Sequence, residues 1–296
     1  MAAPGGLLRR DVVVDDGGPM TRVFLIGGNG YLGSHLAPAL SAAGYDPVVI
    51  GREDDPEGPG PVVYLAGGGG PVAAEGDPLG AVRGVEHACR YARNPRRPLI
   101  FASSIYVYPP GASDCHEGGP LGPETLYGAC KAAVEAGIEP AVVLRFGAIY
   151  GGRIDSGRPP EVLTRFALRA VVGQPLEATD PDRILDLIHV EDAVSAILAV
   201  LVDLDTTAPV YNEVYNVGGN APVTVADLAE RVVEAAVHRG CHRSEIRRGD
   251  VRSGVLRTLN LREAESSLGW TPAWTLSAGI EAVVAEALSA ADRRTP

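Results

Sequence analysis

The sequence predicts an α/β fold in which helices cover both faces of a parallel β-sheet. Short apolar runs rich in Val and Ile recur as far as residue 190, and helical stretches separate most of them. A glycine-rich turn joins the first run to the first helix. Apolar strands that alternate with helices are typical of a parallel sheet buried on both faces.

The first of these elements lie in the segment 21–44, TRVFLIGGNGYLGSHLAPALSAAG. This segment predicts a strand, a glycine turn and an Ala/Leu-rich helix that ends near Gly44. Beyond about residue 218 the pattern is mainly helical, which predicts a smaller lobe beside the sheet. Further strands are expected at 47–50, 61–67, 98–104, 141–147 and 186–190, and helices at 81–92, 127–137 and 191–202.

Composition limits the class of protein. The chain has 296 residues, of which 46% are hydrophobic, so it can bury a substantial core. A formal net charge of −11 argues against a nucleic-acid binder, which usually displays a basic face. No apolar run approaches the roughly 18 residues of a membrane span, and the first residues do not show the charged-then-apolar pattern of a signal peptide, so we expect a cytoplasmic protein. The 4 cysteines match no zinc spacing, and no metal site is expected.

The glycine turn predicts a dinucleotide-binding site. Gly27, Gly30 and Gly33 stand in GxxGxxG spacing between the first strand and the first helix. This arrangement allows a tight turn, a close approach of the backbone to a pyrophosphate, and a helix N-terminus that favours the anion.

Arg52 bears on the choice of dinucleotide. It follows the second strand, where NAD-binding proteins of this kind usually carry an acid for the ribose 2′-hydroxyl. A guanidinium favours a 2′-phosphate, and therefore NADP(H). NAD(H) stays open, because Arg52 could be a solvated loop charge and Glu53, Asp54 and Asp55 would repel a phosphate unless they point away.

Lys131 is the one lysine among 26 basic residues, and Tyr127 stands four positions before it. The two side chains share one face of a predicted helix. A tyrosine hydroxyl becomes a useful acid or base when a nearby cation stabilises the phenolate, and a compact ammonium suits this role better than a wide guanidinium. Ser103 and Ser104, at the end of a predicted strand, supply hydroxyl groups for the reacting oxygen; helix or turn capping is their alternative role.

These residues resemble the extended short-chain dehydrogenase/reductases, in particular their nucleotide-sugar epimerase, dehydratase and ketoreductase group. The resemblance spans about residues 21–285 and rests on GGNGYLGSHL, VVYLAG, FASSIYVY, YGACK, VVLRFGAIYG, DLIHVEDAVSAI, YNVGG and LGWTPAWTLSAGI. It implies a Rossmann-type doubly wound parallel sheet, a nicotinamide cofactor, a nucleoside-diphosphate sugar as ligand and a homodimer. It also divides the chain into an extension (1–20), a dinucleotide-binding domain (21–150 plus 185–218) and a nucleotide-sugar substrate lobe (151–184 plus 219–296).

The resemblance assigns roles to individual residues. Tyr127 is implied as the acid/base, Lys131 as its partner and ligand of the nicotinamide ribose, and Ser104 as the hydroxyl that orients the keto oxygen. The implied cofactor contacts are Gly27, Gly30, Tyr31, Leu32, Gly33, Arg52, Leu65, Ala66, Gly67, Ser103, Tyr127 and Lys131. The implied substrate contacts are Ser104, Tyr106, Arg183 and Arg248.

Departures from the family pattern narrow the expected reaction. Ile105 and Tyr106 occupy positions that are acidic in dehydratases, which disfavours dehydration, and Ala148 replaces a frequent Asn, as in deoxysugar ketoreductases. The interval 52–61 is too short for a crossover helix and predicts that the third strand and its helix are missing. His189 and Asp192 are interpreted as a structural turn and helix start.

Together these features predict an NADPH-dependent reduction of a nucleoside-diphosphate 4-keto-(deoxy)hexose, with Tyr127 as the proton donor. Two alternatives stay open. The first is a nucleotide-sugar 4-epimerase with tightly bound NAD and the same three residues. The second is a non-catalytic nucleotide sensor on the same fold, which would have no need of an acid/base.

Overall fold

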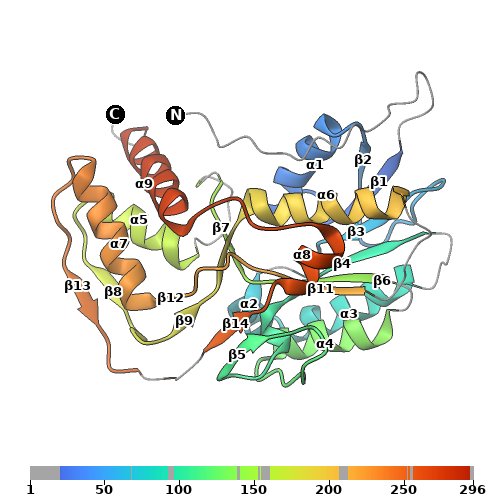
Figure 1. Ribbon diagram of the computed structural model, residues 1–296, viewed down its shortest axis with the longest axis horizontal. Coiled ribbons are helices and arrows are strands. Elements are labelled where there is room, and N and C mark those ends of the chain that lie inside the picture. Colours follow the sequence, from blue (N-terminus) through green and yellow to red (C-terminus); the bar gives the residue numbers. More distant parts are fainter. Residues whose placement is uncertain are drawn as a thin grey trace.

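A six-stranded parallel sheet lies at the centre of the molecule (Figure 1), with the strand order β11-β6-β4-β3-β1-β2. The structure is a computed structural model, and it describes residues 21–67, 69–92, 97–138, 141–152, 154, 161–206, 213–251, 253 and 256–293. The strands of the sheet are β1 (Arg22–Ile26), β2 (Asp46–Ile50), β3 (Val62–Tyr64), β4 (Leu99–Ser104), β6 (Ala141–Phe146) and β11 (Glu213–Val217).

Helices cover both faces of this sheet. On one face α1 (Tyr31–Ala42) and α6 (Val190–Thr206) share an apolar core with Val23 and Leu25 of β1. On the other, α3 (Pro78–Ala92) and α4 (Leu126–Gly137) pack with Phe24 and Ile26. Successive side chains of a strand point to opposite faces, so an uninterrupted apolar strand satisfies both cores. The predicted doubly wound α/β fold is confirmed.

The connection from β2 to β3 contains neither helix nor strand. Both strands pair with β1, one on each side, so residues 51–61 cross β1 as a loop and leave β2 at the edge of the sheet. The Tyr91 hydroxyl of α3 holds this loop, since it lies 3.0 Å from the carbonyl oxygen of Arg52 and 2.9 Å from that of Asp54. The predicted loss of the third strand and its helix is confirmed.

A second apolar core lies beside the sheet, on the left in Figure 1. Its helices are α5 (Val162–Val171), α7 (Val225–His238) and α9 (Leu276–Asp292). Thr224 and Thr275 start α7 and α9, because their hydroxyls accept hydrogen bonds from the backbone N–H groups of Asp227 (3.0 Å) and Ala278 (3.2 Å). Four short strands border this lobe in two pairs: β8 (Leu176–Ala178) pairs with β13 (Ile246–Arg248), and β12 (Val223–Thr224) pairs with β9 (Ile184–Leu185).

One expected strand is not part of the sheet. Within 186–190, β10 (Leu187–His189) pairs with β7 (Ala148–Tyr150) outside it, and β11 is the sixth strand instead. The buried Asp186 carboxylate accepts hydrogen bonds from the N–H groups of Gly219 (3.2 Å) and Leu259 (2.9 Å), and its carbonyl accepts from Ala148 of β7 (2.7 Å), so its partners lie outside the central sheet. An apolar run alone could not distinguish these two arrangements.

The chain returns from the lobe to the sheet after residue 256. β14 (Arg257–Leu259) pairs with β5 (Ala112–Cys115), and α8 (Arg262–Leu268) follows. Ala264 and Trp270 then join the core beneath α1 and α6. Two further short helices, α2 (Gly70–Gly76) and η1 (Ile105–Val107), follow β3 and β4.

The crossover loop generates a stability prediction at Gly60. Its φ is +138°, and a Cβ atom there would lie 2.2 Å from the carbonyl oxygen of Arg22 in β1. We expect Gly60→Ala to lower the free energy of unfolding by about 3 kcal/mol, because the loop must move away from the sheet. Guanidinium-induced unfolding measures this loss.

Gly58 in the same loop is the matched control. Its φ is +91°, but a Cβ atom would meet only the flexible Arg22 guanidinium, at 3.6 Å. Gly58→Ala should therefore lose about 1 kcal/mol, the ordinary strain of a left-handed backbone. Equal losses in the two variants would show that the close approach to β1 is not a constraint.

Candidate active site

The glycine turn between β1 and α1 has the close packing that its spacing predicts. Gly27 has a φ of +86°, and a Cβ atom there would lie 2.8 Å from the backbone nitrogen of Ala66. A Cβ on Gly33 would lie 2.5 Å from Gly28 Cα. The Gly30 N–H donates to the Gly27 carbonyl at 2.9 Å, which closes the turn. Larger residues would fill this cradle, so the turn fits the close approach of a pyrophosphate.

The N-terminus of α1 is open at this turn. Gly30 precedes the helix without a side-chain cap, and the first turn of α1 carries no acid. Its N–H groups and dipole therefore favour an anion. Tyr31, the first residue of α1, donates its hydroxyl to the carbonyl oxygen of Gly151 and joins the helix to the loop after β7. The segment Leu65, Ala66 and Gly67 follows β3, and Leu65 N–H bonds the Ile26 carbonyl at 2.8 Å, so this segment lies beside the turn.

Arg52 follows β2 at the same end of the sheet, and the three acids after it are engaged elsewhere. Glu53 and Asp55 face the basic side chains of α3, whereas Asp54 folds back onto the backbone. The contacts are His87–Glu53 at 3.2 Å, Arg90–Glu53 at 3.5 Å, Arg90–Asp55 at 3.5 Å, and the Gly51 N–H to Asp54 at 3.0 Å. The carboxylates that would repel a phosphate beside Arg52 are thus each paired with a donor.

Tyr127 and Lys131 lie in the first two turns of α4, which Thr125 caps by accepting from the N–H of Gly128 at 3.1 Å. The Lys131 side chain is buried, and its ammonium donates to the Ala102 carbonyl at 2.6 Å. It lies 4.8 Å from the centre of the Phe101 ring and 5.7 Å from that of Tyr127.

Burial is the main influence on the Lys131 amine. It lowers the pKa of Lys131 to about 8, because an apolar environment disfavours the charged form. The carboxylate of Glu135, one helical turn further along α4, acts in the opposite direction and raises this pKa. An ammonium held this close to the Tyr127 ring can stabilise a phenolate.

The two serines at the end of β4 have different roles. Ser104 is buried, and its hydroxyl oxygen accepts from the Tyr106 N–H at 3.3 Å, which starts η1. The hydroxyl proton of Ser104 can still be donated to a ligand. Ser103 donates its own proton to the Glu135 carboxylate, so its hydroxyl is directed into the protein. The predicted contact of Ser103 with the cofactor stays a prediction, in which only its oxygen could take part.

Tyr106 links the acid/base to the substrate side of the site. Its ring packs edge-on against Tyr127, with the centroids 5.9 Å apart, and its hydroxyl accepts from Arg183 at 2.7 Å. The Arg257 guanidinium lies 5.3 Å from the centre of the Tyr106 ring. The Nε of Arg183 is buried with no hydrogen-bond partner among the described residues, which leaves a donor for a ligand. Tyr106 and Arg183 are therefore brought together with Tyr127.

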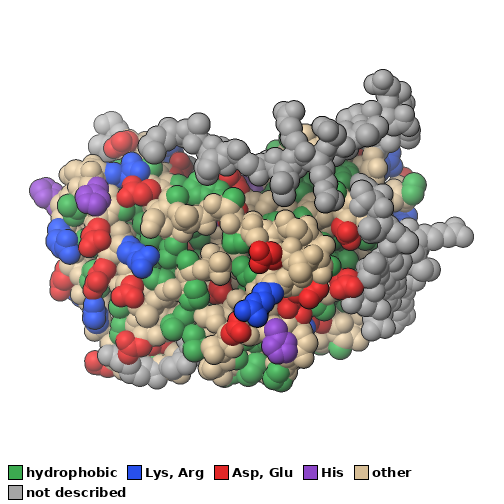
Figure 2. All heavy atoms as spheres, viewed as in Figure 1, with side chains coloured by type: hydrophobic (Ala, Val, Ile, Leu, Met, Phe, Trp, Pro, Cys, Tyr) green, Lys and Arg blue, Asp and Glu red, His purple; other side chains and the backbone are tan. Residues whose placement is uncertain are grey.

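Arg248 is not part of this cluster. It is exposed on β13 and pairs with Glu230 of α7 at 2.5 Å. Basic and acidic side chains are interspersed over this end of the lobe (Figure 2), where Arg239 also pairs with Glu281. The predicted contact of Arg248 with a diphosphate stays a prediction.

His189 and Asp192 have structural roles, as the sequence indicated. His189 is buried and stacks on Trp274 with the ring centroids 3.9 Å apart. Burial lowers the pKa of His189 to about 4, so the ring is neutral near pH 7. Asp192 accepts from the N–H groups of Ala273 (2.9 Å) and Trp274 (3.1 Å), which joins the segment before α9 to the start of α6.

Three residues around the site were missed by sequence reasoning. Glu135 and Arg145 form a buried ion pair at 2.7 Å behind Lys131, and Arg257 faces Tyr106. The i+4 spacing of Glu135 from Lys131 could have indicated it, whereas the two arginines come from distant strands and carried no local signal. The described residues include no group of His, Cys, Asp and Glu that could hold a metal ion, and none of their helices is long and apolar enough to span a membrane.

Comparisons with known proteins identify relatives of this chain. A low-salt glycan biosynthesis protein, Agl12 from Haloferax volcanii, is 27% identical over 178 residues, which cover 57% of this chain and 54% of that protein. The chain thus spans about half the length of this curated relative. A family model described as the NAD dependent epimerase/dehydratase family matches residues 23–218.

Solved structures have the same fold. UDP-glucose 4-epimerase from Thermus thermophilus, in complex with NAD, has a TM-score of 0.71 at 24% identity, over 93% of this chain and all (100%) of that one. RMD from Pseudomonas aeruginosa, complexed with NADPH, has a TM-score of 0.75 at 23% identity, over 92% of this chain and 100% of that one. The resemblance to extended short-chain dehydrogenase/reductases is thereby confirmed. Because the family model matches well over half of its residues, the chain belongs to the NAD dependent epimerase/dehydratase family.

Proposed function

We propose that the protein is an enzyme that reduces a nucleoside-diphosphate 4-keto-(deoxy)hexose with NADPH. The observation that carries this proposal is the cluster of Tyr127, Lys131 and Ser104, with the neutral side chains Ile105 and Tyr106 where an eliminating enzyme would need carboxylates. A cluster with one acid/base and no second carboxylate suits proton transfer to a single oxygen.

The chain's own residues divide this work. Tyr127 donates its hydroxyl proton to the keto oxygen of the sugar, and the Lys131 ammonium stabilises the phenolate that is left. Ser104 donates a hydrogen bond to the same oxygen and fixes its position, because its own oxygen is already held by the Tyr106 N–H. A nicotinamide dinucleotide in the Gly27–Gly33 cradle would supply the hydride.

We place the sugar nucleotide against Tyr106 and Arg183. The Arg183 guanidinium already bonds the Tyr106 hydroxyl, and its buried Nε is a donor without a described partner. Together with the nearby Arg257, these groups suit the oxygens of a diphosphate or sugar. Arg248 remains a candidate for a second phosphate contact from the lobe.

The main alternative is a nucleotide-sugar 4-epimerase that keeps NAD bound and uses the same three residues. The similarity to the Thermus thermophilus UDP-glucose 4-epimerase favours it. Purified protein that contains NAD and consumes no NADPH would support the epimerase and exclude net reduction.

The acid/base assignment predicts the effect of Tyr127→Phe. We expect kcat for the reduction of a 4-keto-sugar nucleotide to fall roughly 10²- to 10⁴-fold, because no group replaces the lost proton donor. A panel of such nucleotides with NADPH, followed by loss of its absorbance, measures this effect. Tyr215→Phe removes a hydroxyl from the sheet core instead and should leave kcat unchanged. Full activity of Tyr127→Phe would refute the assignment and show that another group donates the proton.

The cofactor preference depends on Arg52. Arg52→Gln should lower kcat/KM for NADPH roughly 10- to 100-fold and leave that for NADH nearly unchanged, because a charge-assisted bond to the 2′-phosphate is lost. Arg83→Gln changes an exposed arginine of α3 and serves as the control. An equal effect of Arg52→Gln on both cofactors would argue against NADP(H).

A homodimer is part of the proposal, formed through α2, α3 and α4. Val72, Leu79 and Val82 of α2 and α3 are 82%, 72% and 54% exposed, and the exposed face of α4 carries Ala129 and Ala133. Large exposed apolar side chains beside small ones suit a helix-to-helix contact with a second copy. This contact would involve the helix that bears Tyr127.

The dimer contact is tested by Val82→Glu. We expect light scattering to report a monomer for this variant and a dimer for the parent, because a charge would be buried between the copies. Val172, also 54% exposed but at the end of α5, provides the control Val172→Glu. A dimer that survives Val82→Glu and Leu79→Glu together would exclude this surface.

A further inference from the structure

Glu135 lies on the same face of α4 as the acid/base pair. Tyr127, Lys131 and Glu135 follow one another at intervals of four residues, so each side chain is next to the one a turn away. The Glu135 side chain is only 7% exposed. A buried carboxylate is costly unless cations and hydrogen bonds compensate it, so its partners matter.

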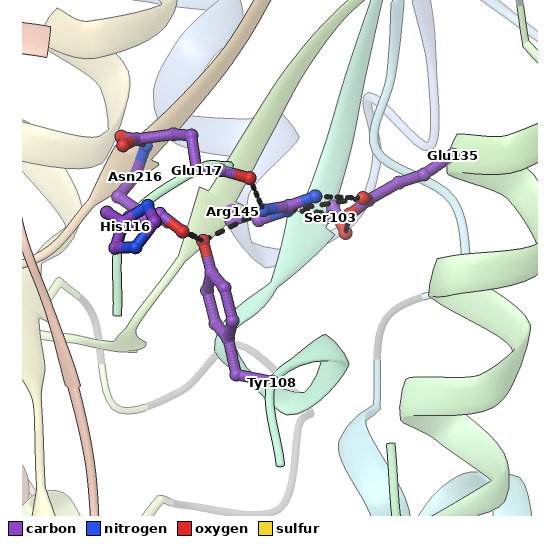
Figure 3. A network of polar contacts seen from close by, with 7 residues as sticks. All are labelled: Ser103, Tyr108, His116, Glu117, Glu135, Arg145 and Asn216. Atoms are coloured by element: carbon purple, nitrogen blue, oxygen red, sulfur yellow. Dashed lines mark hydrogen bonds and ion pairs between the residues drawn. The ribbon is translucent and has the colours of Figure 1, made fainter. Parts of the chain in front are cut away.

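Arg145 of β6 is the principal partner of this carboxylate (Figure 3). Its Nε lies 3.1 Å and its terminal nitrogen 2.7 Å from the same Glu135 oxygen, which makes a forked ion pair. Its other terminal nitrogen donates to the Tyr108 hydroxyl at 2.8 Å and to the Glu117 carbonyl at 2.9 Å. The guanidinium is thus held at both ends, and it fixes Glu135 against the central sheet.

Glu135 also interacts with Ser103, the neighbour of Ser104, and with Lys131 of the proposed catalytic cluster. Ser103 donates its hydroxyl to the carboxylate (Figure 3), and the charge of Glu135 opposes the effect of burial on the Lys131 amine. A merely structural ion pair would need only Arg145. Here the carboxylate also faces the residue before Ser104 and the residue that stabilises the phenolate.

The surroundings of Lys131 contain few other charges. On its own helix the ionisable groups around the amine are Glu135, which has the larger effect, Cys130, and Tyr127, whose ring centre lies 5.7 Å away. From the elements packed against α4, β4 contributes the Ala102 carbonyl and the Ser103 hydroxyl, and β6 contributes Arg145. Tyr106 of η1 packs against the Tyr127 ring, and Cys89 of α3 lies near Gly137 at the far end of α4. Among these groups Glu135 is the carboxylate that can compensate a buried ammonium.

We infer that Glu135 is a positioning residue for the acid/base pair: anchored by Arg145, its carboxylate keeps Lys131 in the charged form and holds the end of β4 through Ser103. The catalytic consequence of this inference rests on the proposed function. The electrostatic part does not, since it concerns the lysine alone.

Because Lys131 is the sole lysine of the chain, its titration can be followed directly. Protein grown with ¹³Cε-labelled lysine gives one side-chain signal by NMR, and its shift against pH yields the pKa of Lys131. Glu135→Gln should lower the pH midpoint of the Lys131 titration by about one pH unit or more, as expected for the loss of an adjacent opposite charge. Glu135→Asp keeps the charge and should restore most of the parent midpoint.

Glu117→Gln is the matched control. It is the same substitution in the same network (Figure 3), but the Glu117 side chain accepts from the Asn216 N–H at 2.8 Å, and its link to Arg145 is through the backbone carbonyl. The lysine midpoint should not move in this variant. An equal fall in Glu117→Gln and Glu135→Gln would indicate a general loss of packing and overturn the inference.

Glu135→Gln leaves the Arg145 guanidinium buried without its partner, which can prevent folding. The double variant Glu135→Gln with Arg145→Gln removes both charges and keeps donors and acceptors at both positions. An unchanged lysine midpoint in folded Glu135→Gln would refute the role of Glu135. The double variant also loses the Arg145 cation, so it is compared with Arg145→Gln, and an equal lysine midpoint in these two proteins would refute the role as well.

The titration needs no substrate, so its outcome is independent of the reaction. If reduction of a keto sugar is also observed, the alkaline limb of its pH–rate profile should move to lower pH in Glu135→Gln. The sign follows because a lower lysine pKa means that the ammonium is lost at a lower pH. A shifted titration with no reductase activity in the parent would reject the proposed function alone.

Discussion

The buried ion pair between Glu135 and Arg145 connects the helix that bears Tyr127 to the centre of the sheet. It takes two charges out of water, and it is tolerated because neighbouring groups complete the hydrogen bonding. Tyr108 receives one bond from Arg145 and donates to Asn216 Oδ1 at 2.8 Å, and the Asn216 amide in turn donates to carbonyls of Cys115 (2.8 Å) and Asn260 (3.1 Å). The network therefore runs from α4 through β6 and β11 to the segment that returns from the lobe. Removing one partner would leave an uncompensated charge, at a cost of about 3–5 kcal/mol.

The same region shows why position 145 suits an arginine and position 131 a lysine. Arg145 occupies a place where a forked cation has an acceptor for each nitrogen: the Glu135 carboxylate on one side, and Tyr108 and Glu117 on the other. Lys131 occupies a place bounded by one carbonyl and two aromatic rings. A guanidinium there would bury five N–H donors with few acceptors, whereas an ammonium is compact and has three.

Local patterns predicted most of the fold and the placement of Tyr127 beside Lys131. The glycine turn, the apolar strands and the Tyr127–Lys131 spacing are short-range signals, and the short interval 52–61 correctly indicated that a helix is missing. The sixth strand could not be assigned in this way, because β11 carries Glu213 and Asn216 and is not an apolar run, whereas the pairing that places β10 outside the sheet is tertiary. The contacts of Ser103 with Glu135 and of Arg257 with Tyr106 join segments far apart in sequence, so no local pattern predicted them.

Replacing the crossover helix by a loop makes the end of β2 dependent on α3. A helix satisfies its own backbone groups, whereas a loop must find partners elsewhere. Here the Tyr91 hydroxyl supplies a donor to two loop carbonyls, and Arg90 and His87 pair with the loop's acids. Since Arg52 lies within this loop, its place beside the glycine turn is maintained by the packing of α3 on the sheet. The preference for NADPH that we assign to Arg52 therefore depends on both the loop and α3, and α3 would influence this preference without contacting the cofactor.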